Sequence, residues 1–168
     1  MTSLYLVRHG ETVDNARQVM QGQTQGALNE NGIQQARLLG MQLKDETFDA
    51  FVASDLHRSI ETCKILAEPH HQPVITTPLL RERDWGSFTG RFIPDLKGEP
   101  WTDDIESLDA LQDRARRFLS YIREAFPEKR VLAVGHGIIN KAIQAVHFGK
   151  TMSEVQKMTN CEVRILQL

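Results

Sequence analysis

The amino-acid sequence predicts a single three-layer α/β domain, with a mainly parallel sheet flanked by helices and a short lid. Three observations lead to this fold class. Short apolar runs that are typical of buried strands alternate with segments whose apolar residues recur at helical spacing. Hydrophobic residues make up 40% of the chain and charged residues 25%, as is usual for globular proteins. The 168 residues suit one domain over 1–168, and they contain no internal repeat or low-complexity tract.

The expected strands are short apolar runs, and the first of them has the most polar chemistry at its end. Leu4–Val7 is followed directly by Arg8 and His9, and Gly10 then breaks the apolar pattern. The remaining expected strands are Ala50–Ala53, Val74–Thr76, Val131–Val134 and Val163–Leu166. Because strands that alternate with helices form mainly parallel sheets, most of these strands should end at one shared edge.

Helical periodicity follows the first two strands. Asn29 is a suitable N-cap for an amphipathic helix. Ser54 and Asp55 form a capping signal for the next helix, which Pro69 should end. The segment Glu11–Gly26 is polar and rich in glutamine and glycine, so we expect a loop there.

The second half of the chain contains one irregular segment. Residues 87–105 lack clear periodicity, and we expect them to form a short lid rather than a second domain. An amphipathic helix follows Ser107 and should end at Pro127, another follows Gly135, and a short one is expected near Ser153–Met158. Four aromatic residues should pack the lid onto the sheet, or alternatively line a pocket: Trp85, Phe88, Phe92 and Trp101.

Composition excludes several classes of function. The formal net charge of −2 gives no basic field for nucleic acid, and no basic amphipathic run suggests a membrane surface. The run Leu4–Val7 is too short for a signal peptide, and no segment has transmembrane length. Cys63 lies in a helical pattern and Cys161 in a strand pattern, so we expect no disulfide framework and a cytoplasmic, reducing environment.

Several ionisable side chains are expected to lie at the carboxyl edge of the sheet. They are Arg8, His9, Arg58, Glu82 and His136. Arginine binds phosphate oxygens in bidentate fashion, and the helices that begin at this edge should offer further backbone N–H donors. Two arginines, two histidines and one carboxylate suit phosphoryl transfer, which depends mainly on positioning and charge stabilisation.

The motifs that contain these residues resemble those of the histidine phosphatase superfamily, also called phosphoglycerate mutase-like. They occur in the family's order and reach across most of the chain. The matching pieces are Arg8–Thr12 with Asn15, Gln21–Gly22, Ser54–Ser59, Leu80–Glu82 and Gly135–Gly137.

The resemblance implies a role for each of the central residues. His9 resembles the nucleophile that takes the phosphoryl group as a phosphohistidine. Arg8, Arg58 and His136 resemble the phosphate pocket, and Glu82 resembles the general acid that later activates water. A nucleophilic imidazole must be neutral, and two neighbouring arginines should disfavour its protonation. No metal ion and no cofactor are expected, because these cations and His136 supply the charge stabilisation.

Residues at the border of the expected site have weaker assignments. Asn15, Gln21 and Gly22 resemble positions beside the pocket that contact phosphate or substrate. Three basic residues could meet a second anionic group of the substrate, or be solvated charges of the lid: Arg83, Arg91 and Lys97. Four histidines match no catalytic position and no metal-ligand spacing: His57, His70, His71 and His147.

The most specific function that follows is a phosphatase acting on small phosphorylated metabolites, with a phosphoprotein as another possible substrate. The segment between Glu82 and His136 must also supply a long helix and a strand, which leaves only a modest lid. A mutase benefits from an extensive cover that keeps water from its phosphoenzyme, so hydrolysis is favoured. The alternatives are a phosphoglycerate mutase-type transfer, a phosphohistidine protein phosphatase and a non-catalytic phosphate-binding module. The sequence does not identify the substrate.

Overall fold

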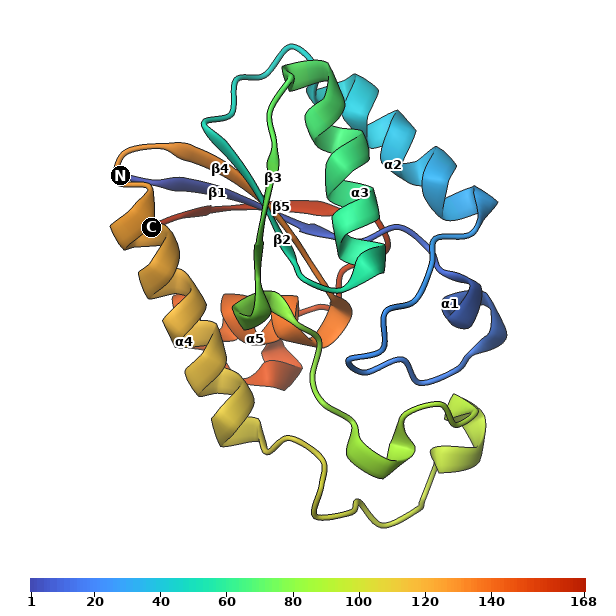
Figure 1. Cartoon of the computed structure of the whole chain (residues 1–168). Helices are drawn as coiled ribbons and strands as arrows, with labels where there is room; N and C mark the ends of the chain where they lie inside the picture. Colours follow the sequence, from blue (N-terminus) through green and yellow to red (C-terminus); the bar gives the residue numbers. More distant parts are fainter.

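A five-stranded sheet with the strand order β3-β2-β4-β1-β5 forms the centre of the protein (Figure 1). The structure is a computed structural model that describes residues 1–168. Neighbouring strands are parallel except for β5, which runs antiparallel to β1. The strands are β1 Ser3–Arg8, β2 Ala50–Ser54, β3 Val74–Thr77, β4 Arg130–Gly135 and β5 Val163–Gln167. The predicted fold class, with its mainly parallel sheet, is confirmed.

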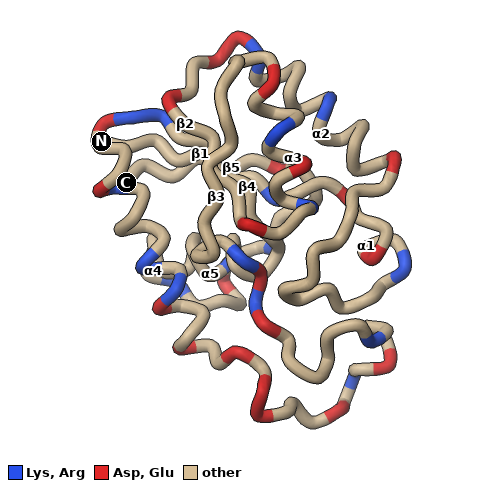
Figure 2. The backbone as a smooth tube through the Cα atoms, in the orientation of Figure 1, with Lys and Arg blue, Asp and Glu red and all other residues tan.

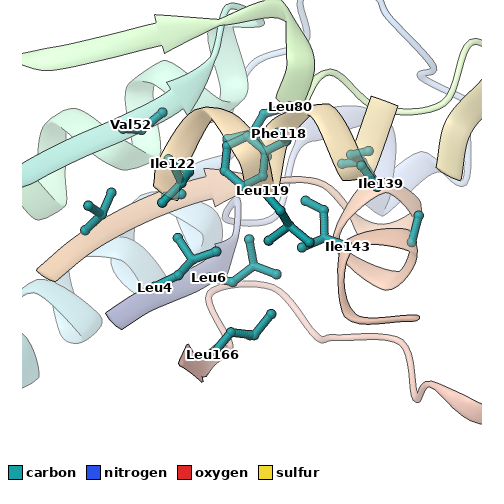
Figure 3. Close-up of a cluster of buried hydrophobic side chains, with 14 of the residues drawn as sticks. Leu4, Leu6, Val52, Leu80, Phe118, Leu119, Ile122, Ile139, Ile143 and Leu166 are labelled. Carbon is teal, nitrogen blue, oxygen red and sulfur yellow. The ribbon is translucent and has the colours of Figure 1, made fainter. Parts of the chain in front are cut away.

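Helices cover both faces of the sheet, because side chains alternate between the faces along each buried strand. Leu4 and Leu6 of β1 pack with α4 and α5, whereas Tyr5 and Val7 pack with α2 and α3. Figure 3 shows the first of these two layers, where Phe118 of α4 lies among the side chains of the sheet. The helices are α1 Val13–Arg17, α2 Glu30–Leu43, α3 His57–Ala67, α4 Leu108–Ala125 and α5 Gly137–Phe148.

The neighbouring strands β1 and β4 end level with each other. Arg8, the last residue of β1, pairs in register with Gly135, the last residue of β4. The chain leaves β1 toward α2 on one face and leaves β4 into α5 on the other face. Such a reversal opens a crevice beyond the carboxyl ends of the strands. It places His9 beside His136, with their ring centroids 5.0 Å apart.

Helix starts agree with the sequence at two positions and differ at a third. Asn29 caps α2 and Ser107 caps α4, and each side chain accepts a hydrogen bond from the backbone N–H three residues later. The predicted capping signal at Ser54 and Asp55 is wrong, because the N-cap of α3 is Leu56 and no side chain caps this helix. Both side chains have tertiary partners near the site instead.

Smaller differences occur in the connecting segments. The expected loop 11–26 contains the short helix α1, which begins with a reciprocal capping box between Thr12 and Asn15. The short helix expected near Ser153–Met158 is a 3₁₀ turn at Met152–Glu154. Cys161 lies in a turn before β5 rather than in the strand. No helix of the protein is both long and apolar enough to cross a membrane.

The 87–105 segment folds mainly on itself, below the sheet in Figure 1. Its aromatic residues do not pack it onto the sheet as predicted. A separate small core contains Phe88, Leu96 and Ile105, with Met20 and Trp85 at its border. Backbone hydrogen bonds join this segment to the loop after α1, as in the bond from the Gly90 N–H to the Met20 carbonyl, 2.8 Å long. Phe92 and Trp101 are largely exposed.

Candidate active site

A cavity of about 190 Å³ lies at the carboxyl edge of the sheet. It is bounded by the ends of β1 and β4, the loop after α1 and the start of the 87–105 segment. Apart from His136, which lies behind it, every residue predicted for the site lines this cavity: Arg8, His9, Asn15, Gln21, Gly22, Arg58 and Glu82. The prediction that these distant sequence positions converge is therefore met.

His9 is buried at the floor of the cavity and is held in one tautomer. Its Nδ1 lies 2.7 Å from the carbonyl oxygen of Gly10. A carbonyl only accepts, so Nδ1 has the proton and Nε2 has a free lone pair. Burial, together with the positive charge of Arg58, lowers the pKa of His9 to about 3. The neutral imidazole that a nucleophile requires is thus present at neutral pH, and burial contributes more to this than the arginines do.

The two arginines are fixed by backbone carbonyls rather than by carboxylates. Arg58 is 1% exposed and donates to the carbonyls of Gly22 and Thr24, the former at 2.7 Å. Arg8 donates from Nη1 to the carbonyl of Met158 at 2.7 Å. The Nε atoms of both guanidinium groups are buried and have no hydrogen-bond partner in the protein. No ion pair neutralises either arginine, so both retain their full charge beside His9.

His136 is fully buried, and Ser54 orients it. The Ser54 hydroxyl accepts a hydrogen bond from the Leu56 N–H at 3.4 Å and lies 2.7 Å from Nε2 of His136. With one bond accepted, the hydroxyl can donate its proton to Nε2, which leaves the imidazole proton on Nδ1. Burial lowers the pKa of His136 well below its usual value, so the ring is neutral. Nδ1 is buried without a partner.

Glu82 lies against the N-terminus of α5, where its carboxylate occupies the backbone donors. One oxygen accepts from the Ile138 N–H at 3.0 Å, and the other accepts from the N–H groups of Ile139 and Arg83 at 3.0 and 2.8 Å. We predicted that the N-terminus of α5 would offer its N–H groups to an anion. This is wrong for the N–H groups of Ile138 and Ile139, which are already bonded to Glu82. They fix Glu82 at the cavity wall instead.

The N-terminus of α3 is also satisfied within the protein. The side chain of Gln25 accepts from the His57 N–H at 3.0 Å, and the backbone carbonyl of Gln25 accepts from the Arg58 N–H at 3.3 Å. Asp55, predicted as a cap, forms two hydrogen bonds of 2.7 and 2.6 Å with Arg81. These N–H groups of α3 are therefore not free to bind an anion, contrary to the prediction.

A family model described as "Histidine phosphatase superfamily (branch 1)" matches residues 4–168. The chain belongs to the histidine phosphatase superfamily.

Relatives in this superfamily include both phosphatases and mutases. The uncharacterized phosphatase PhoE of Bacillus subtilis is 38% identical over 141 residues, which cover 82% of this chain and 72% of PhoE. The probable phosphoglycerate mutase GpmB of Photorhabdus laumondii is 36% identical over 152 residues, covering 82% and 71%.

Solved structures of similar proteins agree with the fold. YhfR of Bacillus stearothermophilus has a TM-score of 0.93 at 27% identity and covers 100% of this chain and 92% of its own. A phosphoserine phosphatase mutant of Entamoeba histolytica, in complex with phosphoserine, has a TM-score of 0.88 at 25% identity, covering 98% and 90%.

The structure adds a partly buried network that supports Glu82 and that the sequence did not indicate. Arg114 of α4 forms an ion pair of 2.8 Å with Glu106. The same guanidinium donates to the carbonyls of Leu79, Arg81 and Glu82, at 3.1, 2.5 and 3.3 Å. These bonds tie the Glu82 loop to α4. In the sequence, Arg114 is one of several basic residues along an amphipathic helix, so no local signal distinguishes it.

A second residue that the sequence analysis missed is Lys157, which also lines the cavity. Three other basic residues were considered as partners for a second anionic group of the substrate, and two of them have partners elsewhere. Arg83 is buried, donates to the Glu106 carbonyl at 2.8 Å and lies against the rings of Trp85 and Trp101. Arg91 pairs with Glu99 through two bonds of 2.7 Å. The third, Lys97, is exposed and does not line the cavity.

The remaining histidines lie away from the cavity, which they do not line. His70 packs against Phe48 and Phe51, and His147 packs against Phe148. His57 is exposed on α3 beside Glu61. No group of three or more His, Cys, Asp or Glu side chains is arranged to hold a metal ion.

The buried neutral histidines predict a loss of stability in acid. The pKa of His9 is about 3 in the folded protein, whereas an unfolded histidine has a pKa of about 6.5. Between these values the unfolded chain binds a proton that the folded chain does not. Stability due to this group is therefore complete above about pH 6.5 and decreases toward pH 3, by up to about 1.4 kcal/mol per pH unit. His136 should add to the effect in the same direction.

Urea denaturation at several pH values from 7.5 to 4.5 would measure this loss. We expect His9→Gln to weaken the pH dependence of the free energy of unfolding, while the same change at the exposed His57 should leave it unaltered. Equal slopes for wild type and His9→Gln would contradict the buried neutral state of His9.

Proposed function

We propose that this protein hydrolyses phosphate monoesters of small metabolites through a phosphohistidine on His9, without a metal ion or cofactor. In this proposal 1–168 acts as one catalytic domain in the cytoplasm, and the 87–105 segment is its lid. The observation that carries the proposal is a set of three buried donors around His9 that lack partners in the protein: Nε of Arg8, Nε of Arg58 and Nδ1 of His136. Phosphate oxygens are suitable acceptors for all three.

The reaction would proceed in two displacements at phosphorus. The Nε2 lone pair of His9 forms a bond to phosphorus as the bond to the ester oxygen breaks, and Glu82 gives its proton to that oxygen. Arg8, Arg58 and His136 stabilise charge on the equatorial oxygens during this step. Glu82 then takes a proton from a water molecule whose oxygen attacks phosphorus, and the bond to His9 breaks. Inorganic phosphate is released, and the neutral imidazole of His9 and the protonated Glu82 are regenerated.

Residues at the side of the cavity support this arrangement. Asn15 is fixed by its capping box with Thr12, and Gln21 is buried with an Oε1 that has no partner. We propose that both contact the phosphate or the ester group. Gly22 acts through its backbone, since its carbonyl accepts from Arg58. The cavity of about 190 Å³ is smaller than the roughly 300 Å³ at which drug-sized sites begin, which favours compact substrates.

A mutase reaction is the second candidate, because the GpmB relative is named as a probable phosphoglycerate mutase. A mutase must keep water away from its phosphoenzyme. Here the 87–105 segment has a core of only three buried residues, and Phe92, Ile93 and Trp101 are 47%, 44% and 58% exposed. This limited cover favours hydrolysis. With 3-phosphoglycerate as the probe, hydrolysis would release inorganic phosphate, whereas a mutase would form 2-phosphoglycerate, and ³¹P NMR distinguishes the two.

Trapping the phosphoenzyme tests the mechanism directly. Wild-type protein would be mixed with p-nitrophenyl phosphate in EDTA, quenched in alkali, digested and examined by mass spectrometry. We expect turnover in EDTA and a phosphoryl group on the peptide that contains His9. A phosphoryl group on another residue, or turnover that EDTA abolishes, would overturn the mechanism. Binding of inorganic phosphate without any turnover or trapped group would favour the non-catalytic module, and activity restricted to a phosphohistidine protein would favour a protein phosphatase.

A further inference from the structure

Lys157 is a cation at the cavity that the proposed chemistry does not use. It lies between the 3₁₀ turn Met152–Glu154 and β5, next to Met158, whose carbonyl accepts from Arg8. Lys157 lines the cavity together with Arg8, His9 and Glu82. Its side chain forms no ion pair and no hydrogen bond within the protein.

Gly137 makes room for Lys157 and Arg8 on one wall. A methyl group placed on Gly137 would lie 2.8 Å from Cε of Lys157 and 3.5 Å from Cζ of Arg8. Two cationic side chains thus converge here, and the carboxylate of Glu82, which lines the same cavity and attracts both, forms an ion pair with neither. Such a pair is costly without a bound anion, and partial desolvation of the ammonium group together with the charge of Arg8 lowers the pKa of Lys157.

The depth of Lys157 separates it from the phosphate donors. His136 and Arg58 are 0% and 1% exposed, whereas Lys157 lines the cavity as a solvent-exposed residue and so lies nearer its mouth. A phosphate at the floor must direct its ester group outward, past Glu82 and toward the mouth. The ammonium group therefore lies where the leaving group of a substrate would be, rather than where its phosphate would be.

No other cation is available at the mouth. Arg83 and Arg91 have partners within or beside the 87–105 segment, and acidic positions outnumber basic ones along that segment (Figure 2). The outer lining also includes Val19 and Ile93, which are apolar. An anionic group on the leaving side of the substrate would have Lys157 as its partner.

We propose that Lys157 is a specificity-determining residue that binds a second anionic group, such as a carboxylate, on the leaving group of a compact phosphomonoester. This inference rests on the proposed function, because the hydrolytic site defines which end of the substrate is outward. A charge-assisted hydrogen bond to one anion should favour it over a neutral isostere by about tenfold or more.

Matched pairs of small esters test the proposal. Phosphoglycolate and 3-phosphooxypropionate differ in reach, and each would be compared with its neutral carboxamide. The measured quantity is the ratio of kcat/KM for the acid to kcat/KM for the amide. We expect Lys157→Met to lower this ratio by about tenfold for at least one pair. The control Lys129→Met removes the same charge from an exposed position beside the start of β4, at the opposite edge of the sheet, and should keep the wild-type ratio.

A binding experiment separates failure of the inference from failure of the proposed function. Calorimetry in the His9→Ala background would measure the Kd of the same four probes, with and without Lys157→Met. If wild type hydrolyses none of the probes, the proposed function fails for them, yet a preference for acids that Lys157→Met removes would still support the anion subsite. Equal losses for acid and amide would assign Lys157 to the phosphate itself, and no loss for either would remove it from recognition. Both outcomes overturn the proposal.

Discussion

Replacing His9 by alanine is expected to lower kcat for p-nitrophenyl phosphate by about four orders of magnitude or more. The imidazole is the only group at the cavity floor whose free lone pair is fixed by a hydrogen bond on its other nitrogen, to the Gly10 carbonyl. Without it, phosphoryl transfer would require direct attack by water, and Glu82 cannot act as the base for that water while it protonates the leaving group in the same step. The three donors of the phosphate pocket remain, so phosphate affinity should persist while turnover is lost.

Initial rates and phosphate binding would be measured on the same preparations. The exposed His57 on α3 provides a matched control, because His57→Ala removes an imidazole that does not line the cavity. We expect wild-type rates from this control. Near wild-type turnover by His9→Ala, with circular dichroism confirming a folded protein, would eliminate the phosphohistidine mechanism.

Replacing Gly32 by alanine is expected to destabilise the protein by about 3 kcal/mol or more. Gly32 lies in the first turn of α2 against the loop that follows His9. A Cβ at this position would overlap the carbonyl oxygen of Glu11 and lie 2.8 Å from its backbone nitrogen. These backbone atoms cannot yield as a flexible side chain can, and Gly10 approaches the same turn closely. The clash should therefore displace the loop and lower activity as well.

Gly40 of the same helix offers a control with the same substitution. A Cβ there would have its nearest contact at 3.6 Å, an ordinary van der Waals distance. Because alanine favours a helix over glycine, Gly40→Ala should be neutral or stabilising by up to about 1 kcal/mol. Urea denaturation and thermal melts would measure both variants. A Gly32→Ala protein as stable as Gly40→Ala would contradict the close packing of the loop against α2.

Local sequence signals were sufficient to locate much of the site, because many of its residues lie at or just after the ends of strands. Apolar runs are sufficient to identify buried strands, and parallel strands bring their carboxyl ends together. The shared strand ends alone place Arg8 and His9 near His136, and the register of β1 with β4 agrees with this. Asn29 was likewise predicted as a cap, because a capping bond spans only three residues, and the helix predicted to follow Ser107 begins there.

The sequence by itself therefore determined the fold class and the position of His9 at the carboxyl edge of the sheet. Only the tertiary structure decided which donors face the cavity. Ser54 orients His136 instead of capping α3, Glu82 occupies the backbone donors of α5, and Arg114 and Lys157 approach from elements distant in the sequence. The physical reason is that a hydrogen-bonding group can satisfy a local or a distant partner at similar energy. Packing of the helices on the sheet selects between the two.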